Sequence, residues 1–219
     1  VGGGIVWDSE ADLEYQEAFL KAQVLVQRQP SFELLETMRW SEDEGYFLLD
    51  LHLQRLAQSA EYFGFPLDPA NTTELLEDLV SDFSGPTRVR LLVDKNGGIV
   101  LESFPLEIAV EQRSLHVALA AEPVSADNNW LYHKTTNRTV YEEARASRPE
   151  ADEVILWYEA GEVTEGPVTN VVLVLDGQLV TPPGVCGFLN GTFRQYLLQE
   201  GHIYEKRILI ADLHRCRKD

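Results

Sequence analysis

The sequence lacks the features that mark disulfide-bonded, zinc-binding or membrane-spanning proteins. Its 219 residues include two cysteines, Cys186 and Cys216, and no C-x-x-C pair or Cys/His cluster. We therefore expect neither a disulfide framework nor a metal site. No run approaches the roughly eighteen apolar residues of a membrane helix, and no basic segment precedes a hydrophobic stretch as in a signal peptide. The expected location is the cytoplasm, with no membrane partner.

Positive charge is also scarce. Lysine and arginine number 18 against 36 aspartates and glutamates, a net charge of −18. A protein with this excess of carboxylates is not expected to bind the phosphate backbone of a nucleic acid. The hydrophobic content of 44% and charged content of 25% are typical of globular proteins. The length fits one large domain or two small ones.

Apolar spacing and turn residues predict the elements of the first half of the chain. Apolar residues from Leu49 to Phe63 recur at helical spacing, and Gly64 is a typical C-terminal stop. Lys95-Asn96-Gly97-Gly98 is a typical hairpin turn. Helices are expected over residues 10–27, 49–63 and 72–83, and strands over residues 32–40, 45–49, 88–93 and 99–102.

The second half is richer in short strands. The polar segment of residues 122–130 is typical of an interdomain linker. Strands are expected over residues 115–120, 153–158, 162–164, 170–175, 178–181 and 203–208, and helices over residues 140–148 and 192–199. The pattern predicts an α+β protein in two lobes rather than a doubly wound sheet.

Lys134 follows a turn-prone segment and precedes a short helix, within His133-Lys134-Thr135-Thr136. A partly buried lysine with a lowered pKa acts as a nucleophile or a base. The common alternative is a solvated loop lysine, and the residue alone does not decide between the two.

Five other residues are open to a chemical or a plain interpretation. Gly191 precedes a predicted helix, where free N–H groups would bind an anion or where glycine only ends a loop. Glu165 lies where Gly and Pro interrupt a strand, and its carboxylate either faces a site or lies in an exposed turn. Arg88 and Arg90 lie two apart on one strand, either on a carboxylate-binding face or on the solvated side of the sheet. Arg55, on its helix beside His52, is otherwise an ordinary surface arginine.

In their order along the chain, these segments resemble the class IV aminotransferases, which are pyridoxal-phosphate enzymes of fold type IV. Two segments, His133-Lys134-Thr135-Thr136-Asn137-Arg138 and Phe188 to Arg194, are most similar to the 4-amino-4-deoxychorismate lyases of that family. The resemblance rests on Leu35-Glu36-Thr37-Met38-Arg39, His52-x-x-Arg55-Leu56, Lys134, Glu165 with Asn170, and Gly191-Thr192-Phe193-Arg194. It implies a small N-terminal α/β lobe over residues 31–122 and a β-rich, barrel-like cofactor lobe over residues 123–219.

The resemblance also implies roles for individual residues. Lys134 would hold pyridoxal 5′-phosphate as a Schiff base and, once released, move protons. Glu165 would face the pyridine nitrogen and keep it protonated. Arg55 and the N–H groups around Gly191, Thr192 and Phe193 would hold the phosphate.

Further residues are implied near the substrate. Asn170 would line the cofactor site, and Thr37 and Arg90 would bind substrate. The implied reaction removes pyruvate from 4-amino-4-deoxychorismate and leaves 4-aminobenzoate, a step of folate biosynthesis. A homodimer with its site near the interface is also implied.

The first thirty residues resemble a different family. Gly2-Gly3-Gly4-Ile5-Val6, then Glu14-x-x-Glu17 and Lys21-Ala22, are similar to the C-terminal tail of chorismate-binding enzymes. In that family the two glutamates help to hold Mg²⁺, but with the rest of the domain absent we expect no metal site here. The segment implies a fused aminodeoxychorismate synthase–lyase, with a glutamine amidotransferase subunit as a possible partner of the whole protein.

Two alternatives remain at this point. Members of the lyase family continue past a segment like residues 209–217 into a strand and a loop that complete the phosphate pocket, and this sequence ends at Asp219. We therefore expect a lobe that is incomplete at the C-terminus, and one alternative is a truncated chain without cofactor or activity. The other is a transaminase of the same family that acts on branched-chain or D-amino acids, although the synthase-like N-terminus favours the lyase.

Overall fold

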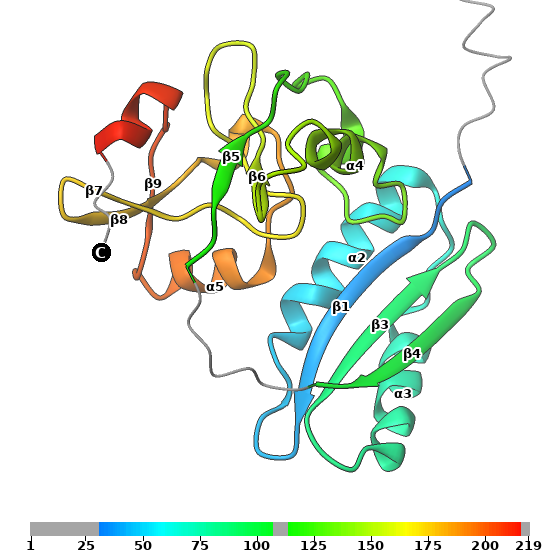
Figure 1. Ribbon diagram of the computed structural model, residues 1–219. Helices are drawn as coiled ribbons and strands as arrows, with labels where there is room; N and C mark the ends of the chain where they lie inside the picture. Colours follow the sequence, from blue (N-terminus) through cyan, green and yellow to red (C-terminus); the bar gives the residue numbers. More distant parts are fainter. Residues whose placement is uncertain (1–30, 107–113, 216–219) are drawn as a thin grey trace, which may run out of the picture. The chain divides into compact units, whose positions relative to one another are not determined.

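The computed structural model describes residues 31–106 and 114–215, and from Phe32 onward they belong to one compact unit, Phe32–Asp219 (Figure 1). The helix expected over residues 10–27, with Glu14 and Glu17, lies outside the described residues, as does Cys216. The fusion to a synthase and the lobe boundary at residue 122 stay predictions. Along the described part of the chain, no helix is both long and apolar enough to span a membrane.

A four-stranded antiparallel sheet forms the first half of this unit, in the order β2-β1-β3-β4. The strands are β1 Leu34–Ser41, β2 Gly45–Tyr46, β3 Thr87–Val93 and β4 Ile99–Pro105. The predicted hairpin between β3 and β4 is confirmed. Gly97 has a φ of 85°, and the Asp94 side chain accepts hydrogen bonds from two backbone N–H groups of the turn.

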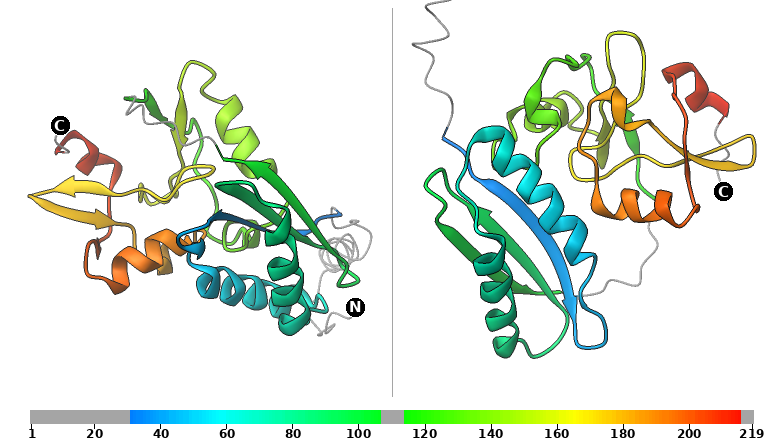
Figure 2. Two further views of the ribbon diagram at one scale, coloured as in Figure 1. Left: turned by 90° about the horizontal axis from the view of Figure 1, so that it is seen from below. Right: turned by 180° about the vertical axis from the view of Figure 1, so that it is seen from behind.

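Two helices, α2 Leu49–Phe63 and α3 Pro69–Leu79, pack on one face of this sheet (Figure 2). The predicted stop of α2 is confirmed, because Gly64 has a φ of 68° and its N–H bonds back to the helix. α3 begins earlier than residue 72, since Asp68 accepts hydrogen bonds from the N–H groups of Ala70 and Asn71. It ends in a 3-10 turn, Val80–Asp82.

The alternation of β1 decides which residues meet the helices. Leu34, Glu36 and Met38 are buried on the side that α2 and α3 cover. Thr37, between them, faces the opposite side and pairs with Arg90 of β3. One side of β1 thus supplies a core with a carboxylate inside it, and the other side is free to line a site.

The second half consists of short strands and helices. β5 Val117–Leu119 pairs in parallel with β6 Glu153–Ile155, and β7 Leu173–Leu175, β8 Gln178–Thr181 and β9 Tyr204–Glu205 form a second sheet. The helices are α4 Thr139–Ala146 and α5 Thr192–Gln199, with 3-10 turns at Asn129–Leu131, Gly184–Cys186 and Ile210–Arg215. The α+β class is confirmed, and α5 has the predicted bounds.

Several predictions for the second half need correction. Residues 162–164 form no named strand, because Glu162 bridges to Leu209 while the next residue, Val163, bridges to Trp157. The strand expected over residues 170–175 begins only at Leu173, and the one expected over residues 203–208 is confined to Tyr204–Glu205. The expected linker of residues 122–130 is packed into the second half, where Val124 bridges to Tyr158.

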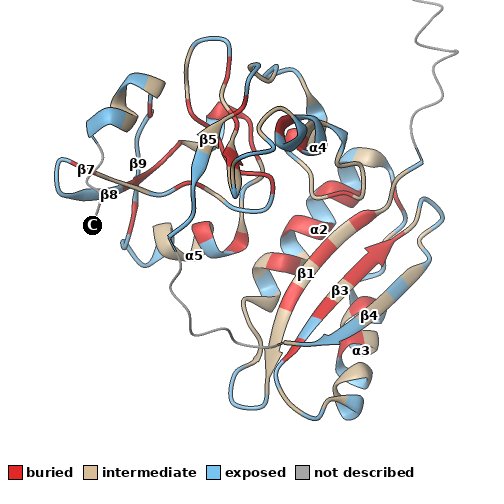
Figure 3. Ribbon diagram, in the orientation of Figure 1, coloured by how far each residue is buried: buried red, intermediate tan, exposed pale blue. Residues whose placement is uncertain are grey.

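Most of the buried apolar residues belong to three hydrophobic clusters, and Figure 3 colours the ribbon by burial. The first joins the four-stranded sheet to α2 and α3, and includes Leu56 and Leu76. The second packs α4 against β6 and the segment before Lys134, and the third packs β7 and β8 against Ile208. The second cluster is the one that fixes the backbone leading to Lys134.

Replacement of Leu76 by alanine tests the first cluster. Leu76 is 0% exposed, so Leu76→Ala leaves a cavity and is expected to cost about 2–5 kcal/mol of unfolding free energy. Urea denaturation measures the loss. Glu77→Ala, at the exposed neighbouring position of the same helix, is the control, with an expected change within about 0.5 kcal/mol. A loss below about 1 kcal/mol for Leu76→Ala would contradict the packing.

Candidate active site

Lys134 is held against the edge of β1 by backbone hydrogen bonds on both sides. Its carbonyl accepts from the N–H of Leu35 at 3.0 Å, and Thr136 donates to the carbonyl of Glu33 at 2.9 Å. The Thr136 hydroxyl accepts the N–H of Glu33 at 2.9 Å in return. The sheet of the first half therefore fixes the backbone at Lys134 itself, while the second cluster holds the preceding segment through Leu131.

The environment of Lys134 favours its neutral amine. Burial lowers the pKa of Lys134, and the nearby Arg55 charge lowers it further, followed by Arg138. The carboxylates of Glu36 and Glu165 oppose these effects without reversing them. A neutral amine is the nucleophilic form of lysine, so the structure supports the chemical interpretation of this residue over the solvated-loop interpretation.

Glu165 lies at a turn that is closed by a bridge between Glu165 and Asn170. Its carboxylate is 3% exposed. Both of its hydrogen-bond donors bind one oxygen: Tyr141 donates to Oε1 at 2.7 Å, and the N–H of Leu189 donates to the same atom at 3.3 Å. Burial raises the pKa of Glu165 to about 7, although these donors and the nearby charges of Arg138 and Lys134 lower it. Glu165 can thus hold or release a proton near neutral pH.

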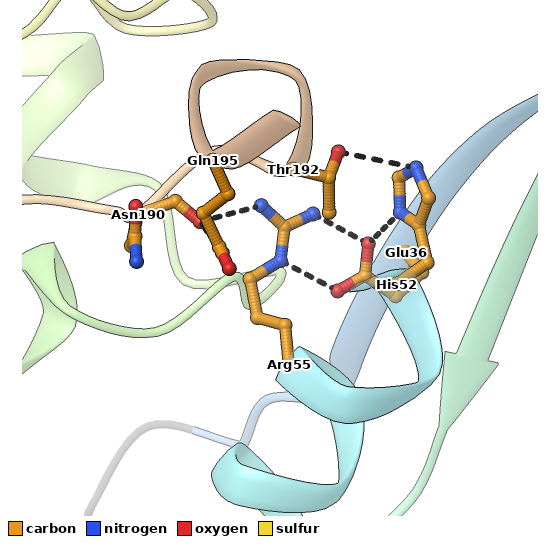
Figure 4. A network of polar contacts seen from close by, with 6 residues as sticks. All are labelled: Glu36, His52, Arg55, Asn190, Thr192 and Gln195. Atoms are coloured by element: carbon orange, nitrogen blue, oxygen red, sulfur yellow. Dashed lines mark hydrogen bonds and ion pairs between the residues drawn. The ribbon is translucent and has the colours of Figure 1, made fainter. Parts of the chain in front are cut away.

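A second buried carboxylate, Glu36, organises the far side of the site (Figure 4). Arg55 donates from Nε to Oε1 at 2.8 Å and from Nη2 to Oε2 at 2.6 Å, and Nδ1 of His52 lies 2.7 Å from Oε2. Burial opposes ionisation of Glu36, but the hydrogen bonds from Arg55 and His52 outweigh it and hold the pKa below its usual value. Glu36 is therefore a carboxylate that fixes Arg55 in place.

The N-terminus of α5 meets this network. Nε2 of His52 lies 3.2 Å from the Thr192 hydroxyl, and Arg55 Nη1 donates to the carbonyl of Asn190 at 3.3 Å. Gly191 precedes the helix, and a Cβ there would lie 1.9 Å from Oδ1 of Asn170, so no side chain fits. The first N–H groups of a helix have no partner within the helix, and they lie at the positive end of its dipole. The backbone N–H groups at the start of α5, beside Arg55, are therefore suited to bind a phosphate.

These groups surround one cavity of about 720 Å³, a size typical of sites for small ligands. Its lining includes eight of the nine residues that the sequence predicted for the site: Thr37, Arg55, Lys134, Glu165, Asn170, Gly191, Thr192 and Phe193. The structure thus brings together residues that are up to 156 positions apart, from Thr37 to Phe193.

The ninth, Arg90, is placed differently from the expectation. It is absent from the cavity lining and donates to Glu102 of β4 at 2.7 Å. Arg88, two residues earlier on the same face of β3, lines the cavity and has its guanidinium 4.9 Å from the ring centre of Phe104. The position along the strand separates the two arginines, and a substrate-binding role of Arg90 stays a prediction.

Four lining or supporting residues were missed by sequence reasoning as site residues. Tyr141 and Arg138 line the cavity together with Glu165, and the Arg138 guanidinium lies 4.3 Å from the Tyr141 ring centre. Glu36 and His52 form the network behind Arg55. The available signal was a glutamate at a core-facing position of β1, since a buried carboxylate needs partners. Among the described residues, no group of three or more His, Cys, Asp or Glu side chains is placed to hold a metal.

Comparison with known proteins identifies the relatives of this chain. Residues 33–218 match the family described as amino-transferase class IV. A Schizosaccharomyces pombe protein, provisionally named an aminodeoxychorismate lyase, is 34% identical over 74% of this chain and 72% of its own length. A Thermotoga maritima protein, provisionally named a branched-chain-amino-acid aminotransferase, is 30% identical over 75% of this chain, which spans 61% of that relative.

Solved structures agree in fold. The crystal structure of a Mesorhizobium loti protein, provisionally named an amino-acid aminotransferase, has a TM-score of 0.77 and 37% identity, over 85% of this chain and 91% of that one. A Mycobacterium tuberculosis protein, described as a hypothetical aminotransferase with PMP and alpha-ketoglutarate bound, has a TM-score of 0.71 and 25% identity, over 84% of this chain and 74% of that one.

Glu165→Gln tests the buried carboxylate without any ligand. A folded-state pKa near 7, against an ordinary value of 4.5, means that the cost of ionising Glu165 is absent below pH 4.5, grows as pH rises and is complete above pH 7. Gln does not ionise, so Glu165→Gln is expected to stabilise the cofactor-free protein at pH 8 by at most about 3 kcal/mol. At pH 5 the gain is expected to fall below about 1 kcal/mol.

Urea denaturation between pH 5 and pH 8 measures this difference, with Glu61→Gln at an exposed position of α2 as the control. An equal gain at both ends of the range would show that Glu165 is not protonated near neutral pH.

Proposed function

Because the chain belongs to the amino-transferase class IV family, we propose that it is a lyase that converts 4-amino-4-deoxychorismate into 4-aminobenzoate and pyruvate. The cofactor of this family is pyridoxal 5′-phosphate. Among its relatives, a protein with a lyase name has 34% identity. The observation that supports the proposal most directly is that one cavity is lined by Lys134, by Glu165 and by a phosphate cradle. This cradle consists of Arg55 and the backbone N–H groups at the N-terminus of α5.

The residues present fit this cofactor. Lys134 has a lowered pKa, which favours the neutral amine, and the neutral amine is the form that attaches to an aldehyde. Glu165 offers a carboxylate that can share a proton with a pyridine nitrogen near neutral pH. Arg55 and the N-terminus of α5, where Gly191 has no room for a Cβ, offer donors for a phosphate. When bound, the cofactor supplies an electron-withdrawing ring that stabilises negative charge next to the substrate amine.

The chain's own groups would then perform the proton transfers. Nζ of Lys134 would take a proton from the substrate and return one where pyruvate leaves. Glu165 would hold a proton near the pyridine nitrogen of the cofactor, and Tyr141, which donates to the Glu165 carboxylate, would keep that carboxylate in one orientation. The two products together contain all the atoms of the substrate, so no oxidant or second substrate is needed. Formation of the aromatic ring drives the release of pyruvate.

The charge of the cavity supports an anionic substrate. The chain has a net charge of −18, yet the lining contains Arg55, Arg88, Lys134, Arg138 and Arg194 against one carboxylate, Glu165. Arg55 and Arg194 are paired with Glu36 and Glu205. Within the described part of the chain, Arg88 and Arg138 are in no ion pair. The proposed substrate has two carboxylates, which these two guanidinium groups could bind.

A transaminase of the same family is the second candidate. It is supported by the Mesorhizobium loti and Thermotoga maritima relatives, whose provisional names are those of aminotransferases. The two reactions differ in their need for an acceptor: a transaminase requires a 2-oxo acid such as 2-oxoglutarate, whereas the lyase does not.

The homodimer also stays a proposal, which sedimentation of the purified chain would test.

A pyruvate assay decides between the candidates. With 4-amino-4-deoxychorismate and no 2-oxo acid, we expect pyruvate and 4-aminobenzoate in equal amounts, and Lys134→Ala is expected to lower the rate at least about 10²-fold. Turnover only of an amino acid together with 2-oxoglutarate would favour the transaminase. Borohydride treatment followed by peptide mapping is the companion measurement. If no cofactor mass appears on the peptide with Lys134, the alternative of a chain without cofactor is correct.

Arg88→Gln tests the source of substrate affinity. Loss of a charge-assisted hydrogen bond of about 1.5–3 kcal/mol is expected to raise the KM for the substrate roughly 10- to 100-fold, with little change in kcat. Arg90→Gln is the matched variant on the same face of β3. If KM rises for Arg90→Gln and not for Arg88→Gln, the sequence-based assignment of Arg90 is correct and Arg88 does not bind the substrate.

A further inference from the structure

His52 lies between the two parts of the proposed phosphate cradle, and neither sequence motifs nor comparison assigned it a role. Its two ring nitrogens have different partners. Nδ1 is 2.7 Å from the Glu36 carboxylate and Nε2 is 3.2 Å from the Thr192 hydroxyl. All three residues are buried: His52 is 6% exposed, Glu36 1% and Thr192 7%. Figure 4 shows this path, which runs from β1 through α2 to the first residue of α5.

The partners determine where the protons lie. Glu36 has a lowered pKa and is a carboxylate, which only accepts hydrogen bonds, so Nδ1 of His52 is the nitrogen that donates. In a neutral ring, Nε2 then has a free lone pair and accepts the hydroxyl proton of Thr192. The hydroxyl proton is therefore engaged by His52. The backbone N–H groups at the start of α5 are what the helix presents to an anion.

Arg55 is held by the same carboxylate and touches the same turn. A guanidinium has five N–H donors. Nε and Nη2 bind Glu36, and Nη1 donates to the carbonyl of Asn190, two residues before Thr192. Nη1 and Nη2 each keep one further N–H for a ligand. Glu36 is thus the common fixed point of Arg55 and of His52, and both side chains reach the start of α5.

We propose that His52 is a positioning residue that sets the separation between the Arg55 guanidinium and the N-terminus of α5, and thereby sets the affinity of the cradle for a phosphate ester. It acts through Thr192 on one side and Glu36 on the other. The inference rests on the cofactor of the family and not on the choice between lyase and transaminase. It predicts that loss of the His52–Thr192 contact weakens binding of the phosphate group and leaves binding of the pyridine ring and aldehyde unchanged.

Two ligands separate these contributions in the whole chain. Pyridoxal 5′-phosphate and pyridoxal have the same ring and aldehyde, and only the first has the phosphate. The dissociation constants of both are measured from absorbance changes, for the wild type, His52→Asn, Thr192→Val and the double variant. In His52→Asn, the amide replaces Nδ1 toward Glu36 and does not reach Thr192. Thr192→Val keeps the shape of the side chain and removes its hydroxyl.

We expect each single variant to bind pyridoxal 5′-phosphate about 10-fold more weakly, the loss of one net hydrogen bond, and pyridoxal within about 2-fold of the wild type. Because both variants break the same contact, between His52 and Thr192, the double variant is expected to bind pyridoxal 5′-phosphate no more than about 2-fold more weakly than either single variant. Thr192→Ser keeps the hydroxyl and is expected to restore phosphate affinity. His202→Asn, at an exposed position three residues beyond the end of α5, is the control for a histidine replacement.

Several results would overturn the proposal. Equal weakening of both ligands would show that His52 only supports the fold of the site. Losses that add in the double variant would show that His52 does not act through Thr192. A wild type that prefers pyridoxal 5′-phosphate no more than pyridoxal would remove the cradle itself. None of these measurements needs turnover, so failure of the lyase proposal leaves the test intact.

Discussion

The Glu36 carboxylate is enclosed between a guanidinium and an imidazole, and the chain on both sides of the cavity is arranged around it. A buried charge is costly unless it is paired and hydrogen-bonded, and removing one partner exposes the whole cost. This requirement ties α2 to β1 through Arg55 and His52. The same two side chains then reach Asn190 and Thr192, so the position of α5 depends on a carboxylate in a strand more than 150 residues earlier.

This arrangement also explains the electrostatics around Lys134. A free arginine beside the lysine would lower its pKa strongly, and a free carboxylate would raise it. Arg55 and Glu36 are paired with each other, so their opposing effects on Lys134 partly cancel, and burial is the largest cause of its lowered pKa. Glu165 is placed differently, since its partners are the neutral Tyr141 and a backbone N–H. That difference is why burial raises the pKa of Glu165 while the pKa of Glu36 is lowered.

The parts of the fold that local chemistry determines could be predicted from the sequence. The stop of α2 at Gly64, the β3–β4 hairpin and the bounds of α5 depend on nearby residues, and all three are confirmed. Residues 162–164 could not be predicted, because consecutive residues there pair with different segments. The order of Lys134, Glu165 and Gly191 indicated the family, but spacing along the chain gave no sign that Tyr141 orients Glu165. Arg88 and Arg90 have the same parity on β3, so only the position of the cavity along the strand distinguishes them.

The cavity lining is positively charged although the whole chain is negatively charged, and two ion pairs make this arrangement less costly. Five lysine or arginine side chains in one lining would repel one another if all were free. Pairing of Arg55 with Glu36 and of Arg194 with Glu205 removes two of these charges from the repulsion, while Arg55 keeps N–H groups for a ligand. The remaining arginine charge then lies at Arg88 and Arg138, which belong to neither α2 nor α5. A ligand with a phosphate and separate carboxylates would match both sets of donors, and the paired glutamates would then contribute to the orientation of that ligand as well as to its affinity.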